Sequence, residues 1–242
     1  MVTNLAYFFE TSRKVRGGKH VWVKDSNGEQ RGNVLLGGTI LNPNKGFGKL
    51  WAAQLVQYTP MQGALIFRSF GLKANAAANA TQYVINGDGY SDAPEVGMVL
   101  MVAPDAVKVE TLSANTETGA VTKTVADYTG QSAKVTAVVY DEAEEKFTIT
   151  LDNTLGALDA GAILVEAEGT KKSATAKVLV PNPNTFIEKD EELLPTEGYG
   201  FQNANYSIST VYNKQAWIAR MQPLPKYVLA KNKSLIDGIF WI

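Results

Sequence analysis

Two clusters of carboxylates are the first candidates for chemistry in this chain. One lies at 141–145 (DEAEE) and the other at 188–192 (EKDEE). Paired carboxylates support glycoside hydrolysis when they stand about 5 to 9.5 Å apart in a cleft. Both clusters here lie in polar stretches beside strand-like runs, so we expect solvated turns with ordinary pKa values and no catalytic pair.

Histidine and cysteine, the usual side chains for nucleophilic and metal chemistry, are nearly absent. The only histidine is His20, beside Val21 and Trp22, and the chain has no cysteine. This composition rules out Cys–His catalysis, disulfides, thiolate-bound zinc and zinc sites with two histidines. A lone histidine beside an apolar strand is typical of packing or surface exposure, so we predict no metal centre.

Two glycine-rich stretches imitate ligand-binding loops without matching them. GFGK at 46–49 resembles part of a phosphate-binding loop, but that loop needs glycine where Pro43 stands and serine or threonine where Leu50 stands. NGDG at 86–89 resembles part of a calcium loop, but it lacks the bidentate glutamate at the required distance. We therefore predict turns at both places, with no cofactor, no metal and no enzymatic activity.

Charge and hydropathy narrow the classes of partner. The 242 residues carry a net charge of −1 with a pI of about 5.9, whereas binding to nucleic-acid phosphates requires a basic surface. The longest apolar run, 96–103, is far short of the roughly 20 residues of a membrane helix. The N-terminus lacks the charged-then-apolar order of a signal peptide. We expect no nucleic-acid and no membrane partner.

Alternating apolar and polar residues predict that β-strands dominate the fold. KFTITL at 146–151 alternates phenylalanine, isoleucine and leucine with threonine, which is the period of a half-buried strand. KVTAVVY at 134–140 and NYSISTVY at 205–212 are similar, and an Asn-Gly pair at 27–28 favours a hairpin turn. The polar stretch 111–131 is predicted as a long excursion or a polar hairpin.

These elements predict the fold class. KLWAAQLVQYTP at 49–60 leaves a short helix and a strand both open, because it is near the lower length limit of a helix. KANAAANAT at 73–81 is predicted as a loop or one or two helical turns, and most other segments are strand-like. We expect a mainly β fold: an antiparallel β-barrel or β-sandwich body with extended N- and C-terminal segments and little helix.

A glycine-containing motif occurs twice. Residues 95–103 (EVGMVLMVA) and 159–167 (DAGAILVEA) each have an acid, a small or branched residue, a glycine and an apolar run that ends in alanine. Glycine adopts backbone angles that turn the chain into a strand at a corner or a bulge. The repetition predicts a body that uses the same corner twice, with the acids and glycines of 146–169 in turns and not in an active site.

The chain is predicted to have three parts. Residues 1–70 form an N-terminal β-rich segment with an arm, 71–187 a central β-barrel or β-sandwich domain, and 188–242 a C-terminal β segment that docks back or onto a partner. The prolines of PNPNTF (181–186) make an extended connector before the last part, because proline fixes φ and lacks a backbone donor.

Aromatic and uncharged segments are candidate docking elements. Only Lys214 is charged between positions 198 and 219, and the chain ends in IFWI (239–242). Burial of each such apolar side chain stabilises by roughly 1.5–3 kcal/mol, so we expect the C-terminus to dock on the chain's own core or on another subunit. Aromatic anchors concentrate the binding energy of interfaces. The candidate partner-binding residues are Tyr7, Phe8, Phe9, Tyr206, Tyr212, Phe240 and Trp241.

Three stretches carry a resemblance to a known class of protein. They are YSDAPEVGMVLMVAPDA (90–106), AKVTAVVYDEAEEKFTITLDNTLGALDAGAILVEAEG (133–169) and AKVLVPNPNTFIEKDEELLP (176–195). This part of the chain, roughly 73–195, resembles head-decoration and head-fibre-type (auxiliary capsid) proteins of tailed bacteriophages, particularly crAss-like and related gut phages. KSLIDGIFWI (233–242) carries a fainter likeness.

The resemblance implies a virion protein on the capsid exterior that contacts the major capsid protein and stabilises the shell or anchors head fibres. It implies synthesis in the host bacterial cytoplasm, with other head-fibre proteins and a trimer of this chain as further partners. Two other classes stay open. In a carbohydrate- or receptor-binding module of a phage fibre, aromatics such as Tyr206 and Trp217 would stack on sugar rings. A glycosidase-like enzyme would need paired acids in a cleft.

Overall fold

The computed structural model describes residues 29–35, 48–50, 54–59, 63–87, 93–114, 121–187, 191–193, 207–212, 214–216, 221–231 and 239–241. Within these ranges β-strands dominate, and the helix is short: α2 (Lys226–Lys231). The prediction of a mainly antiparallel β fold with little helix is confirmed. The body is sandwich-like, with several sheets and no closed barrel among the described strands.

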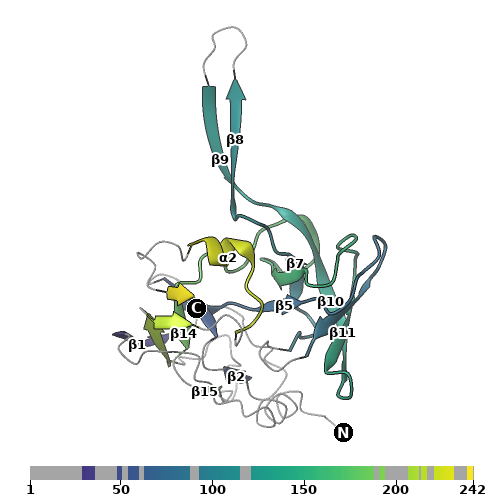
Figure 1. The fold of residues 1–242 in the computed structure, drawn as a ribbon, viewed down its shortest axis with the longest axis horizontal. Coiled ribbons are helices and arrows are strands. Elements are labelled where there is room, and N and C mark those ends of the chain that lie inside the picture. The colour runs from purple at the N-terminus through teal and green to yellow at the C-terminus, as the bar shows by residue number, and fades with distance from the viewer. Residues whose placement is uncertain are drawn as a thin grey trace.

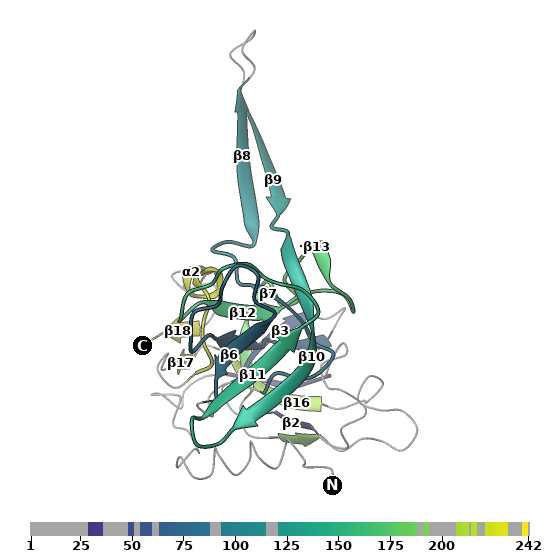
Figure 2. The same cartoon turned by 90° about the vertical axis from the view of Figure 1, so that its right-hand side faces the viewer.

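The largest sheet has seven strands, and its neighbours are antiparallel. In hydrogen-bonded order it contains β5 (Ser69–Gly71), β12 (Ile163–Glu166), β7 (Val99–Val102), β10 (Gly130–Asp141), β11 (Lys146–Leu151) and β6 (Gln82–Asn86), with β13 (Ser173–Ala176) beside β10. The register shifts twice along β10, and such irregularities bend a strand. An isolated bridge from Leu72 to Ile85 joins the segment after β5 to β6, so the sheet curves (Figure 2).

A second sheet of five strands packs beside the first. Its order is β1 (Glu29–Leu35), β16 (Ser207–Tyr212), β14 (Thr185–Ile187), β3 (Leu55–Thr59) and β4 (Gly63–Ile66). Three two-stranded sheets complete the described strands: β2 (Gly48–Leu50) with β15 (Glu191–Leu193), β17 (Lys214–Ala216) with β18 (Ile239–Trp241), and β8 (Lys108–Ala114) with β9 (Val121–Asp127).

The three predicted parts of the chain share these sheets. β1 pairs with β16, and β2 pairs with β15, so strands of the range 1–70 lie beside strands of the range 188–242. β14, from the range 71–187, lies between β16 and β3 in the same sheet. The division of the chain into these three parts stays a prediction.

Several segments form the strands that their pattern predicts. KFTITL is β11, KVTAVVY lies in β10, and SISTVY is β16. The open stretch 49–60 contributes to β2 and contains β3, so its described part is extended. The Asn-Gly pair at 27–28 lies outside the described residues; the strand that follows it, β1, pairs with β16.

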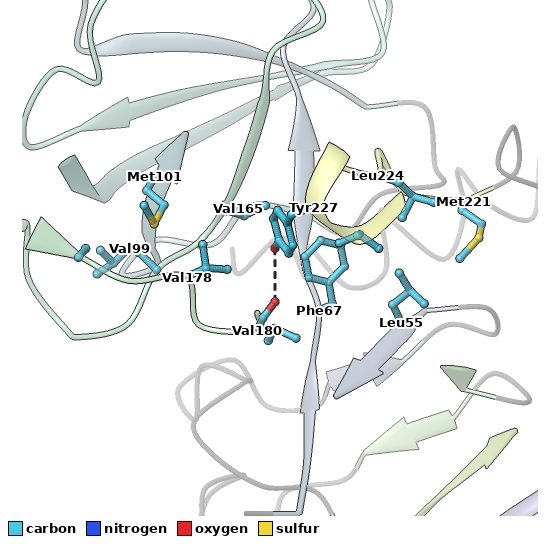
Figure 3. Close-up of a cluster of buried hydrophobic side chains, with 13 residues drawn as sticks. Leu55, Phe67, Val99, Met101, Val165, Val178, Val180, Met221, Leu224 and Tyr227 are labelled. Atoms are coloured by element: carbon cyan, nitrogen blue, oxygen red, sulfur yellow. Dashed lines mark hydrogen bonds between the residues drawn. The ribbon is translucent and has the colours of Figure 1, made fainter. Parts of the chain in front are cut away.

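Two buried clusters hold the body together. In β11 the alternation predicted from the sequence is present, with Phe147, Ile149 and Leu151 buried in the cluster inside the curved sheet. The other cluster lies under α2, where the rings of Phe67 and Tyr227 meet edge to face at 6.4 Å between centroids (Figure 3). The Tyr227 hydroxyl donates to the carbonyl of Val180 at 3.3 Å, and burial raises the pKa of this tyrosine.

The repeated glycine motif forms two equivalent corners, as predicted. Gly97 and Gly161 have φ values of +101° and +87°, which L side chains rarely adopt. In each corner the residue after glycine donates to the acid three positions earlier: Met98 N to Glu95 O at 3.1 Å, and Ala162 N to Asp159 O at 3.0 Å. Both corners are therefore turns with glycine in the third position, which is the type II pattern.

The strands that follow the two corners repeat the same hydrogen bonds. β7 and β12 pair with each other, and Ala103 N donates to Ile163 O as Ala167 N donates to Val99 O, at 2.9 and 2.8 Å. The amides of the two corner glycines also donate to backbone carbonyls, Gly97 N to Val135 O and Gly161 N to Leu72 O, both at 2.8 Å. The units 69–103 and 132–167 are thus two halves related by an approximate two-fold symmetry, each with three strands.

Candidate functional site

Among the elements whose burial the structure describes, the most exposed is the projecting hairpin, which consists of β8 and β9. Both views show it extending away from the body (Figures 1 and 2). All residues of β9 are exposed, as are residues 108–113 of β8, and neither strand pairs with a third described strand. An isolated two-stranded hairpin is only marginally stable in water. Its strands therefore stand where a partner could cover them.

The two faces of the projecting hairpin differ in chemistry. The register places Lys108 opposite Asp127 and Leu112 opposite Lys123, and opposite residues in an antiparallel pair share a face. One face therefore carries both charges and large apolar side chains, and the other carries small and hydroxyl side chains. The mixed face has Lys108, Glu110, Leu112, Ala114, Val121, Lys123, Val125 and Asp127. The hydroxyl-rich face has Val109, Thr111, Ser113, Thr122, Thr124 and Ala126.

The exposed apolar side chains lie mainly on the mixed face. Leu112, Val121 and Val125 are 68%, 64% and 52% exposed, and Val109 on the hydroxyl-rich face is 43% exposed. Lys123 and Glu110 form an ion pair at 2.7 Å among them. The charges on the mixed face balance, so this surface has no net electrostatic attraction for polyanions or polycations.

Backbone groups along both outer edges of the projecting hairpin are also unpaired by described strands. Tyr128 N donates to Val107 O at 2.9 Å, which makes residues 107 and 128 a hydrogen-bonded pair. Bonded and non-bonded pairs alternate along an antiparallel ladder. The backbone groups of the residues on the mixed face therefore point outward, where they present a template for strand addition.

Asp127 ties the root of the projecting hairpin to the body. Its carboxylate pairs with Lys108 of β8 and with Lys177, which follows β13, at 2.9 Å for the second pair. Hydrogen bonds from Lys108 and then Lys177 lower the pKa of Asp127 from 3.8 to about 2. The same contact raises the pKa of Lys177. Asp127 is thus ionised at any physiological pH.

The projecting hairpin lies at a place in the chain where a short turn could replace it. It lies between the two symmetry-related halves, 69–103 and 132–167, in the connection from β7 to β10. The hydrogen bond from Tyr128 N to Val107 O already brings the two ends of this connection together. A turn of two residues could close the chain there, so the hairpin is an addition to the fold.

Of the two predicted acidic turns, the one at 188–192 is described only from residue 191, and there the prediction is wrong, because Glu191 and Glu192 lie in β15, paired with β2. Residues 142–145 form an exposed turn between β10 and β11, as expected. The pKa of Asp141 is lowered, mainly because Glu144 N donates to its carboxylate at 3.2 Å. A general acid needs a raised pKa, and the shift of Asp141 is in the opposite direction. In the part of the chain that the structure describes, no group of three or more His, Asp or Glu side chains is placed to hold a metal ion.

The predicted docking residues lie mostly outside the described part. Tyr7, Phe8, Phe9 and Tyr206 lie outside it. So does His20, which was predicted to be packed or exposed and not to dock. Tyr212 ends β16, opposite Glu29 of β1. Phe240 and Trp241 lie on β18, opposite Gln215 and Ala216 of β17 in a parallel pair. Their role in docking stays a prediction.

Sequence reasoning missed two features. Its docking candidates were aromatic residues, whereas the projecting hairpin is built from Val, Leu, Thr and charged residues that read as an ordinary polar hairpin. It also missed a buried ion pair: Arg68 and Glu166, 5% and 11% exposed, meet at 3.1 Å between the start of β5 and β12. This pair links two neighbouring strands inside the body and is structural.

Comparisons with protein-family models, with curated proteins and with solved structures gave no match to the chain. None of the helices in the described ranges is long and apolar enough to span a membrane. The geometry of the projecting hairpin is therefore the observation from which a function can be argued.

Proposed function

We propose that this chain is a structural protein of a bacteriophage virion, an auxiliary or decoration protein bound to the outside of the capsid through the major capsid protein. It stabilises the shell or anchors head fibres there, after synthesis in the bacterial cytoplasm. The proposal assigns it no enzymatic activity. Its support is the sequence resemblance together with the projecting hairpin, which supplies a dedicated binding element.

The size of the projecting hairpin indicates how it would bind. Seven residues per strand give a length of about 24 Å and, with two strands, a flat face of roughly 240 Å². A stable interface needs about 800 Å² from each partner. One face falls short even if its relief doubles the area. A partner therefore has to cover both faces and the edges, so we propose that the hairpin inserts into a groove of the shell.

The test compares the intact chain with one whose hairpin is removed. Replacing residues 108–127 by Asn-Gly makes a two-residue turn that keeps the hydrogen bond between Val107 and Tyr128. Both proteins are mixed with empty shells of the virus's major capsid protein and sedimented. The intact chain should pellet with the shells, and the shortened chain should stay in solution with an unchanged melting temperature.

Two further deletions separate the hairpin from the docking segments predicted at the termini. Removal of 1–12 or of 239–242 tests the aromatic residues there, including Phe8 and Trp241. If the shortened hairpin variant binds normally and a terminal deletion does not, the termini dock the protein. If the intact chain fails to bind the shells, the decoration role is wrong. A trimer and contacts with other head-fibre proteins belong to the same proposal, and the mass of the bound species tests them.

A further inference from the structure

The root of the projecting hairpin contains an unusually close contact. Tyr128, the first residue after β9, is half-buried and packs against the core cluster that contains Met101. A Cβ added at Gly130 would lie 3.0 Å from Tyr128 Cε1 and 3.1 Å from Met101 Cε. The tyrosine ring therefore lies directly on the glycine backbone, in space that any other residue would fill.

Three further contacts hold the same root. Tyr128 N is bonded to Val107 O, and Val107 packs against the same core cluster as Tyr128. Asp127 bridges Lys108 of the hairpin and Lys177 of the body. Lys177 is itself fixed, because its carbonyl accepts a hydrogen bond from Glu168 N at 2.8 Å. The root is thus attached by backbone, by an apolar ring and by charge.

We infer that these contacts fix the angle at which the projecting hairpin leaves the body, with Gly130 as the residue that sets it. We call the contact of the Tyr128 ring with Gly130 and Met101 the apolar seat. The apolar seat contributes most to fixing the angle, because exposed ion pairs contribute little. Its functional value rests on the proposed role of the hairpin: an element held at a fixed angle loses less freedom when it enters a groove. Tyr128 and Gly130 are then positioning residues that need not touch the partner.

The angle is measurable without any partner. The chain has no cysteine, so spin labels attach only to introduced ones. Val121→Cys labels the far end of β9, and Glu142→Cys labels the exposed turn after β10. With a rise of about 3.4 Å per residue, a rotation of about 10° at the root moves Val121 by about 4 Å. Pulsed electron resonance resolves such a change in the distance between the two labels.

We expect one narrow distance for the doubly labelled protein. Gly130→Val should displace the Tyr128 ring and shift or widen the distance distribution beyond the original width. Tyr128→Leu should also shift or widen the distance distribution, because it removes the ring from the apolar seat. This variant replaces Gly130→Val in the test if Gly130→Val does not fold. Asp127→Asn should give a smaller widening. The control is Thr129→Val, which has a similar shape at an exposed neighbouring position and should change nothing.

A distribution that is already as wide in the original protein as in Gly130→Val would overturn the inference, as would two seat variants with unchanged distances. These outcomes are distinct from failure of the proposed function. A narrow distance that widens in the seat variants, together with no binding to capsid shells, would leave the fixed angle established and remove only its proposed purpose.

Discussion

The seven-stranded sheet and the projecting hairpin are both antiparallel, yet they use their side chains in opposite ways. In β11 the large apolar residues all occupy one face and are buried, while β9 is exposed along its whole length. The mixed face of the hairpin interleaves Leu112, Val121 and Val125 with charged residues. A face of that composition does not pack into an apolar core at low cost, because even paired charges lose their hydration on burial. The two regions therefore differ in where their apolar side chains lie, in the core for β11 and at the surface for the projecting hairpin.

The sharpest way to test this comparison is to truncate one large side chain in each region. Phe147 is 2% exposed and stacks near Tyr140, with 4.6 Å between ring centroids. Phe147→Ala should lower the free energy of unfolding by about 3–5 kcal/mol. Val125→Ala, the matched change in the projecting hairpin, should lower it by less than about 0.5 kcal/mol. Urea denaturation measures both, and equal losses would mean that the hairpin packs on the body.

A medium effect is expected at the two corners of the body. Gly97 and Gly161 have positive φ, and nothing lies within 4 Å of a Cβ added at either. Gly97→Ala and Gly161→Ala should each cost about 1–2 kcal/mol, through backbone strain alone. Because the corners are equivalent, thermal unfolding should show nearly equal losses. A large difference between them would contradict the symmetry of the two halves.

The smallest effect concerns the charge at the hairpin root. Asp127 has a pKa of about 2, below its ordinary 3.8. Its contribution to holding the root is therefore fully present above about pH 3.8 and is lost as the pH falls through about 2. Nuclear magnetic resonance titration of the carboxyl carbon checks this value. Lys177→Met should move the pKa of Asp127 upward, and an unchanged value would show that Lys177 is not its partner.

Local pattern predicted much of the body. The alternation in 146–151 and the two Gly-centred corners depend on neighbours in sequence, so both could be recognised there. The pairing of β1 with β16 could not, because it joins residues about 180 positions apart and their pattern does not name a partner. The same holds for the ion pair between Arg68 and Glu166, whose components look like ordinary surface charges.

The projecting hairpin shows a different limit of sequence reasoning. The sequence pattern predicts its shape, because the polar stretch 111–131 indicates a long excursion or a polar hairpin. The sequence could not predict that no other described strand covers the hairpin. Alternation shows that a strand has two different faces, but it does not show what packs against each face. Aromatic side chains are the usual sequence signal of a docking surface, and β9 contains none, because its apolar and hydroxyl residues are Val, Ala and Thr.

The hydrogen bond between Val107 and Tyr128 has an engineering consequence. Because this bond holds Val107 and Tyr128 side by side, the site between them is suited to the insertion of a foreign sequence. An epitope, a peptide tag or another hairpin grafted between these residues would stand clear of the body, with the core behind it unchanged.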